Sequence, residues 1–411
     1  MKSRLTLLAG SLLVAACATP PQPASAPAVV SPASAPGAEL PPPAPVEPAS
    51  APVVAPPPGR PVSKPIQPPA VLQEGQGRAL LERLLPQGIP DRKGWSNDIM
   101  GAFSHLKIPY TPQFFCAVLA VAEQESGFSP DPVVPNLSKI VWGEIDQRRQ
   151  KYLIPQFVVD AAMSKKSPDG RTFKQRVDAL RTKREMNALY EDMVRELPFG
   201  QTIFEHKNPI RDGGPMQVSV AFAETHVRAW PYPYSYASLR DEVFTRRGSV
   251  YFGTAILLQY PAPYHDMVYR FADFNAGRYA SRNAAFQQAV AKLSGRKLAL
   301  DGDIMLYNNK MNRDLSGEVS DTQRALQAIS GRLGMSDAEM LRDLKLEKLS
   351  GFAQSPLYQK VFALAGSKAP REIIPQIVLV SPKFTHKLTT EWFARRVDGR
   401  YQRCLARDGA N

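Results

Sequence analysis

Apolar side chains recur at helical spacing along most of the chain after residue 72. The pattern predicts helices at 77–85, 96–106 and 114–126, and a long helix over 172–197 that stops before Pro198. The other segments with this spacing are 218–229, 249–260, 264–275, 282–293, 321–333 and 389–405. Ser336, followed three residues later by Glu339, forms a capping box that predicts one more helix start.

One segment has the composition of a strand, because 373–380 is rich in Ile and Val. No sequence period of 20–50 residues repeats in the part of the chain that can fold. We therefore expect a mainly α fold.

The first residues are typical of an exported protein. Lys2 and Arg4 precede an apolar stretch, Leu5–Ala16, that is too short to span a bilayer, which needs about 20 residues. Small residues then precede Cys17, and this arrangement resembles the lipobox of bacterial lipoproteins. We expect a signal peptide over 1–16 and a lipid on Cys17; the alternative is an ordinary secretory signal with an unmodified cysteine.

The expected lipid anchor also indicates a location. Bacterial sorting generally keeps a lipoprotein in the inner membrane when Asp follows the lipidated cysteine. Ala18 stands there instead, so we expect an outer-membrane lipoprotein that faces the periplasm.

Residues 17–72 have the composition of a disordered linker. They hold 19 of the chain's 39 prolines and repeat Pro-Ala-Ser-Ala-Pro from Pro23, Pro32 and Pro48. Such a segment cannot bury enough apolar surface to offset the entropy of ordering, so we expect a semi-extended spacer.

Charge narrows the range of partners. The formal net charge is +13, and removing Lys2 and Arg4 leaves +11. A basic domain attracts anionic polymers and surfaces. Because the chain begins with an export signal, we expect phospholipid or an anionic wall polymer rather than nucleic acid.

Two further cysteines, Cys116 and Cys404, lie in the foldable part. Export permits a disulfide between them, and the alternative is a pair of buried thiols.

Three short motifs occur in order. The first is Glu125-Ser126-Gly127-Phe128, the second runs from Gly213 through Met216 and Gln217 to Val218, and the third is Asp273-Phe274-Asn275-Ala276-Gly277. Together they resemble the Glu-Ser, Gly-Leu-Met-Gln and Ala-Tyr-Asn-Ala-Gly signatures of soluble-type lytic transglycosylases and goose-type lysozymes. The resemblance covers about 125–290. The chain also resembles proteobacterial lipoprotein families of unknown function.

The resemblance implies a domain organisation. It predicts a lysozyme-like helical domain over 73–294, interrupted by a long helical insertion at 136–212. A C-terminal α-rich extension, 295–411, would pack on it. The insertion arises because 89 positions separate Glu125 from Gly214, several-fold more than is usual in the family. We expect it to cover or flank the cleft.

Glu125 is the expected catalytic acid. Val118, Val121 and Ala122 share its helix face, so Glu125 projects from an apolar stripe at a helix end that Gly127 breaks. Such surroundings disfavour a charged carboxylate and raise its pKa, as a general acid requires. Glu123 points about 200° away and is expected to be solvated. The alternative for Glu125 is an ordinary helix-end glutamate paired with an arginine.

The resemblance also assigns residues that bind the glycan. These are Ser126, Gly214, Met216, Gln217, Phe274 and Asn275. On this interpretation Gln217 and Asn275 offer amides, and Met216 forms an apolar wall. The alternative is that the second motif is a plain helix-start loop and the third a helix C-terminus. Phe274 stands where the family usually has Tyr, and Asp273 replaces a small residue.

The implied reaction cleaves the MurNAc–GlcNAc bond of peptidoglycan with one glutamate. Glu125 protonates the glycosidic oxygen and then, as a base, takes the proton of the muramic 6-hydroxyl, which closes a 1,6-anhydro ring. No cofactor and no metal are needed. Hydrolysis would need a second carboxylate, with four candidates: Asp131, Glu205, Asp212 and Asp273.

Other chemistries lack their motifs. The histidines are scattered and no His-Glu-x-x-His occurs; they are His105, His206, His226, His265 and His386. Ser126 lacks a nucleophile elbow, and the chain has no Walker loop or dinucleotide fingerprint. Two non-enzymatic alternatives stay open. One is a lysozyme-like lipoprotein that binds peptidoglycan or an envelope partner without cutting, and the other is a basic adhesin.

Overall fold

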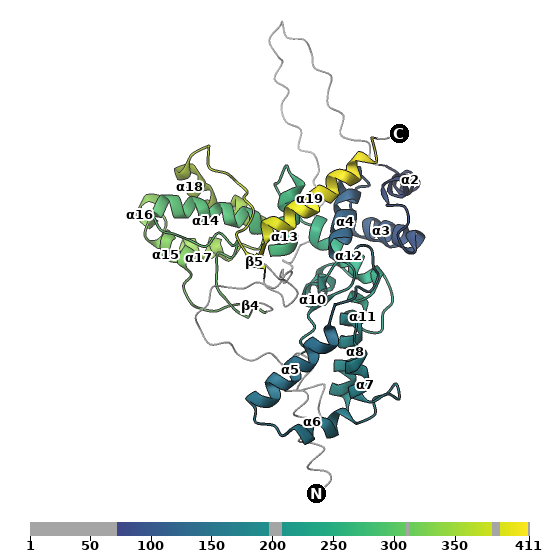
Figure 1. Ribbon diagram of the computed structural model, residues 1–411. Coiled ribbons are helices and arrows are strands. Elements are labelled where there is room, and N and C mark those ends of the chain that lie inside the picture. Colours follow the sequence, from purple (N-terminus) through teal and green to yellow (C-terminus); the bar gives the residue numbers. More distant parts are fainter. Residues whose placement is uncertain (1–71, 197–207, 310–311, 380–386, 410–411) are drawn as a thin grey trace.

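The protein is mainly helical, as predicted. The computed structural model describes residues 72–196, 208–309, 312–379 and 387–409 (Figure 1). Cys17, the predicted signal peptide, nearly all of the linker 17–72, and Glu205 lie outside these residues. In the described part, no helix is both long and apolar enough to cross a membrane.

The largest hydrophobic core is built from both ends of the described chain. Its main helices are α2 (Glu74–Leu84), α3 (Arg92–Leu106), α4 (Pro112–Ser126), α10 (Val220–Ala229), α11 (Leu239–Val243), α12 (Arg246–Leu258), α13 (Met267–Ala276) and α19 (Thr390–Ala406). Tyr190 and Val194 of the insertion also join it. The last helix, α19, runs alongside both α4 and α13 (Figure 1). The chain end is therefore part of the same core as the helix that carries Glu125.

Helix α4 forms where the sequence predicts it, because local signals fix both ends. Thr111 caps the first turn by accepting a hydrogen bond from the amide of Phe114, and Pro112 occupies the first helical position. Gly127 ends the helix in the left-handed conformation, with φ at 58°. Residues 115–122 are all buried, so α4 lies at the centre of the core.

A disulfide joins α4 to α19 through Cys116 and Cys404. Both cysteines are buried in the largest core. Of the two states considered for this pair, the structure has the disulfide.

The insertion has a small hydrophobic core of its own. Its helices are α5 (Leu137–Lys151), α6 (Gln156–Met163), α7 (Phe173–Asp178) and α8 (Lys183–Arg195). They lie together at the lower end of the view in Figure 1. The single helix predicted over 172–197 is wrong, because Thr182 is extended and starts α8 as its N-cap, with Glu185 completing a capping box.

A third core follows in the sequence. Its helices are α14 (Ala280–Ser294), α15 (Asp321–Gln327), α16 (Ser330–Leu333), α17 (Asp337–Leu344) and α18 (Pro356–Ala365), with a 3-10 helix at Ser350–Gln354. The capping box of Ser336 and Glu339 is confirmed at the start of α17. The helix predicted at 321–333 is instead divided into α15 and α16.

The boundary predicted at residue 295 differs from this division into cores. Helix α14, placed in the first domain by sequence, contributes Phe286 and Val290 to the third core. Helix α19, placed in the extension, contributes Phe393 and Val397 to the first. The hydrophobic faces of these two helices, which sequence spacing does not assign to a partner, decide where each belongs.

The strands of the described residues form three two-stranded antiparallel sheets. They pair β1 (Asp212–Gly213) with β2 (Val218–Ser219), β3 (Tyr307–Asn309) with β4 (Asn312–Leu315), and β5 (Val378–Leu379) with β6 (Leu388–Thr389). The strand predicted at 373–380 is reduced to β5. The β1–β2 hairpin carries the second motif.

Candidate active site

Glu125 lies in the last turn of α4 and is half-buried. The helix that presents it is rigidly held, because its preceding turns are buried and its second turn is cross-linked to α19. The neighbouring Ser126 donates its hydroxyl hydrogen to the carbonyl of Ala122 at 2.9 Å. That donor is therefore engaged within the helix, and only the oxygen lone pairs of Ser126 are left for a ligand.

Glu123, predicted to be solvated, keeps 30% of its side chain exposed but is also paired with two arginines. Its Oε1 lies 3.4 Å from Nε of Arg400 and 3.3 Å from Nη2 of Arg403, both on α19. Nothing in the sequence around Glu123 indicates that α19 supplies these partners.

The second motif forms the tight turn of the β1–β2 hairpin, with Gly213 opposite Val218. Gly214 has φ at +68°, and a Cβ there would lie 2.6 Å from the carbonyl oxygen of Val243 and 2.5 Å from the Cβ of Ser249. Only glycine fits this position. Gly214 was predicted to bind the ligand, but in the structure it allows the hairpin to pack closely against α12.

Met216 is fully buried, so the prediction that it lines a sugar cleft is wrong for this conformation. Its amide donates to Oγ of Ser249 at 2.9 Å, and its side chain fills the space above Gly253, where a Cβ would lie 2.6 Å from the sulfur. Met216 therefore anchors the hairpin to α12 rather than meeting a ligand.

Gln217 is the part of this turn that is accessible. It is half-buried, and its backbone is left-handed, with φ at 49°. The side-chain Nε2 donates to the carbonyl of Gly214 at 2.8 Å, and Oε1 accepts from Nζ of Lys183 at 2.8 Å. Both ends of the amide are thus fixed by the protein.

Lys183, at the start of α8, joins the insertion to the hairpin. Besides Gln217 it pairs with Asp212 on β1. The residue before it, Thr182, forms a β-bridge with Val133 in the loop that follows α4. The end of the Glu125 helix and the Gln217 turn are therefore both tied to residues 182–183 of the insertion.

The third motif is buried. Phe274 is 2% exposed and belongs to the largest core, so it does not line a cleft as predicted. Asn275 is 3% exposed, and its Oδ1 accepts from the hydroxyl of Thr390 on α19 at 2.8 Å. Its predicted contact with an N-acetyl group is contradicted by this burial, and the structure gives it the role of holding α13 against α19.

Asp273 is a structural carboxylate. Its two oxygens accept hydrogen bonds from four donors: the hydroxyls of Tyr260 and Tyr264 and the amides of Tyr279 and Ser281. Burial raises the pKa of Asp273. The carboxylate is fully enclosed, so it cannot serve as the second carboxylate of a hydrolase.

The other candidate carboxylates differ in their surroundings. Asp212 is paired with Lys183. Asp131 lies in the loop between α4 and the insertion. Burial raises the pKa of its carboxyl group, and a hydrogen bond from the hydroxyl of Thr182 opposes this shift in part. Among the candidates in the described residues, Asp131 lies near the end of α4, and its surroundings disfavour the charged form. Among the described residues, no group of three or more His, Cys, Asp or Glu side chains is placed to hold a metal ion.

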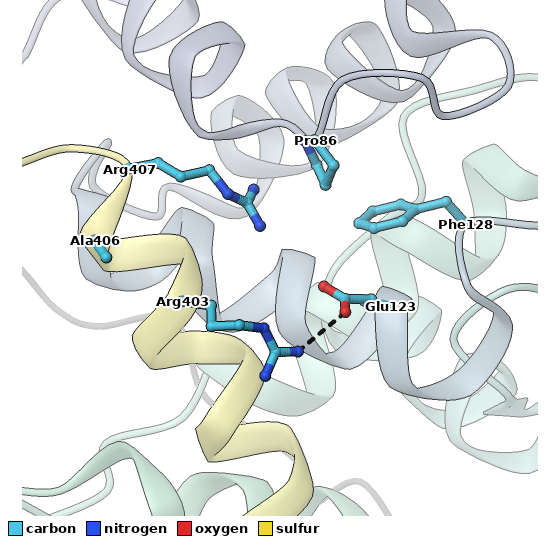
Figure 2. Close-up of a pocket in the computed structure, with 6 residues that line it drawn as sticks. All are labelled: Pro86, Glu123, Phe128, Arg403, Ala406 and Arg407. Atoms are coloured by element: carbon cyan, nitrogen blue, oxygen red, sulfur yellow. Dashed lines mark hydrogen bonds and ion pairs between the residues drawn. The ribbon is translucent and has the colours of Figure 1, made fainter. Parts of the chain in front are cut away.

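A pocket of about 530 Å³ opens beside the end of α4, on the side of Glu123 (Figure 2). It is lined by Pro86, Glu123, Phe128, Arg403, Ala406 and Arg407. Figure 2 shows the guanidinium of Arg407 directed between Pro86 and Phe128, while that of Arg403 meets Glu123.

Sequence reasoning missed both Lys183 and the arginines of this pocket. The signal for Lys183 was present, because Thr182 and Glu185 have the capping-box spacing that starts a helix at that lysine. The arginines of α19 recur at helical spacing, but nothing local relates them to Glu123, 280 residues earlier for Arg403.

Comparison with known proteins adds a family but no activity. Escherichia coli (strain K12) has an uncharacterized protein, YaiW, that is 46% identical to this chain over 347 residues, which are 82% of this chain and 93% of the relative. No solved structure matches the chain. A family model described as a protein of unknown function (DUF1615) matches residues 88–407, which contain all three motifs and both Cys116 and Cys404. The chain belongs to this DUF1615 family.

Proposed function

We propose that the protein is a lytic-transglycosylase-like enzyme that cleaves the MurNAc–GlcNAc bond of peptidoglycan, with Glu125 as the catalytic acid. The observation that carries the proposal is the setting of Glu125. A half-buried carboxyl stands at the end of a buried helix that a disulfide cross-links to α19. The loop after this helix contacts Thr182, and the Gln217 turn contacts the next residue, Lys183.

The arrangement favours one carboxylate over two. Asp273 is enclosed and Asp212 is neutralised by Lys183, so neither is available to activate water. Burial disfavours the charged form of Asp131, which is the form that a base requires. With a single glutamate, the muramic 6-hydroxyl is the natural nucleophile. Glu125 would donate its proton to the leaving oxygen and recover one from that hydroxyl. No metal or cofactor enters this scheme.

Each amide atom of Gln217 already has one protein partner, and Lys183 holds the side chain in place. Because an amide nitrogen carries two N–H donors and its oxygen two lone pairs, we assign Gln217 to binding the sugar with its second N–H and second lone pair while the Lys183 hydrogen bond stays in place. Met216, Phe274 and Asn275 act indirectly in this account, by fixing the hairpin and the α13–α19 pair.

The proposal includes a location in the cell envelope. Lipid on Cys17 would anchor the chain in the outer membrane, facing the periplasm, and residues 17–72 would connect the anchor to the folded part. An extended segment of about 50 residues reaches on the order of 150 Å. The folded domain could then meet the wall while its anchor stays in the membrane.

The test is release of dye from labelled peptidoglycan sacculi by the purified chain. Glu125→Gln keeps the size of the side chain but removes the proton donor, so the rate should fall by about 10²- to 10⁴-fold. Glu74→Gln is the matched control, because Glu74 is an exposed residue of α2 that makes only a 4.0 Å ion pair with Arg78. Equal activity of wild type and Glu125→Gln would refute the catalytic role.

A second candidate function is a silent lysozyme-like protein that binds peptidoglycan or an envelope partner. It is favoured by the burial of Met216, Phe274 and Asn275 and by the occupied amide of Gln217. This alternative predicts that sacculi retain the protein in a pull-down while no fragment is released.

A further inference from the structure

Helix α19 carries a row of arginines on one face. Arg396, Arg400, Arg403 and Arg407 are spaced by four, three and four residues, which places them along one side of a helix. With a rise of 1.5 Å per residue, the row is about 16 Å long. Trp392, four residues before Arg396, extends the same face, and its ring lies 5.2 Å from the Arg396 guanidinium.

Little negative charge faces this row. Arg400 and Arg403 share one carboxylate oxygen, Oε1 of Glu123. Arg396 lies over the ring of Trp392, and Arg407 donates to the backbone carbonyl of Leu84, neither of which carries a formal charge. Burial lowers the pKa of Arg400; Glu123 opposes this, and the neighbouring Arg396 and Arg403 lower it further. The row is therefore short of anions.

The C-terminal part of the row opens into the pocket of Figure 2. Arg403 and Arg407 line it together with the ring of Phe128, which follows Glu125 by three residues, and with Pro86. Guanidinium groups recognise carboxylates through paired hydrogen bonds. The carboxylate of Glu123, held between two arginines, shows which chemical group this surface accepts.

We propose that the arginine row of α19 and its pocket bind a peptide rich in free carboxylates, the stem peptide carried by the muramic sugar. This inference rests on the proposed function, because peptidoglycan supplies such peptides. The middle of the row lies beside the helix that presents Glu125, because Arg400 and Arg403 both contact Glu123, two residues before it. A strand held at Glu125 would then have its attached stems within reach of α19. The stem carboxylates would pair with Arg396 and Arg407 and compete with Glu123 for Arg403.

The test is titration calorimetry of the full chain with disaccharide-peptides released from peptidoglycan. These ligands contain no MurNAc–GlcNAc bond, so binding is measured without cleavage. Three further probes identify the recognised group: the disaccharide with its peptide removed, the disaccharide-peptide with amidated carboxylates, and vesicles of an anionic phospholipid. We expect binding of the intact disaccharide-peptide alone, weakened by salt.

The variant Arg396→Gln/Arg403→Gln should weaken that binding by about tenfold or more. Arg395→Gln is the matched control, because Arg395 is the exposed neighbour of Arg396 and pairs with Glu391 outside the row. Equal weakening by Arg395→Gln would overturn the proposal, and so would unchanged binding by the double variant. It would also be overturned if the double variant lost binding to the vesicles but not to the disaccharide-peptide. If stems bind as expected but wild-type protein releases nothing from sacculi, the enzymatic proposal fails while this site stands.

Discussion

The disulfide between α4 and α19 gives the most quantitative prediction of stability. We consider its removal in two ways: reduction of the wild-type chain, and the variant Cys116→Ala/Cys404→Ala. Reduction breaks the cross-link but keeps both sulfur atoms in the core, whereas the variant also removes the sulfurs. Comparing the two gives the separate contributions of the cross-link and of the packing of the buried sulfurs to the free energy of unfolding.

The magnitude follows from the length of chain that the bond closes. The cysteines are 288 residues apart. The chain-entropy model gives about 5.7 kcal/mol for a loop of that length, above the 2–4 kcal/mol typical of measured disulfides. The insertion and the third core each hold a hydrophobic cluster, so residual structure in the unfolded chain reduces the effect. We expect reduction to lower the free energy of unfolding by about 3–5 kcal/mol.

The assay is guanidinium unfolding followed by tryptophan fluorescence, with and without reductant. The midpoint should fall and the slope should rise on reduction, because a chain without the cross-link exposes more surface when unfolded. The double alanine variant should be about 1 kcal/mol less stable than the reduced wild type because of the cavities left by the sulfurs. A change below 1 kcal/mol on reduction, with an unaltered slope, would refute this reasoning.

Three further predictions concern buried or bridging side chains. Burial, and secondly Arg278, lower the pKa of His226 from 6.5 to about 3, so the unfolded chain takes up the proton first as the pH falls. As the pH falls from about 6.5 to 3, the free energy of unfolding should therefore decrease by up to about 1.4 kcal/mol per pH unit. Urea titrations at several pH values should show a weaker pH dependence for His226→Phe. The same pH dependence in the variant and the wild type would contradict this prediction. Asp273→Ala leaves four donors without their acceptor and should cost about 3–5 kcal/mol in the same assay, and a loss under 1 kcal/mol would show that water replaces the carboxylate. Lys183→Met removes the hydrogen bond that holds the Gln217 side chain in place, so it should slow dye release from sacculi about three- to tenfold, the equivalent of one hydrogen bond. An unaltered rate would show that Lys183 does not position the turn for the reaction.

Local signals made part of the fold predictable. Pro112 and Gly127 mark the two ends of α4, and the capping box of Ser336 and Glu339 marks the start of α17, because each acts through backbone atoms within one turn. The break before α8 was overlooked because 172–197 contains no proline or glycine, although Thr182 carried the signal.

The candidate site was less predictable, because burial depends on contacts between distant segments. Met216 is enclosed through Ser249 on α12, and Asn275 through Thr390, 115 residues later. A motif gives the residue types but not which of them face a ligand. Glu125, Ser126 and Gln217 are the predicted site residues that stay half-buried, whereas Gly214, Met216, Phe274 and Asn275 are buried and support the site from within the fold.

The central claim is that Glu125 cleaves glycan strands without water as the nucleophile. The most direct measurement is mass spectrometry of the fragments that the wild-type chain releases from sacculi. We predict muramic ends with a 1,6-anhydro ring, which are absent when Glu125→Gln replaces the wild type. Ends that have incorporated water would contradict the single-carboxylate mechanism, and no released fragments from wild type would contradict the enzymatic account itself.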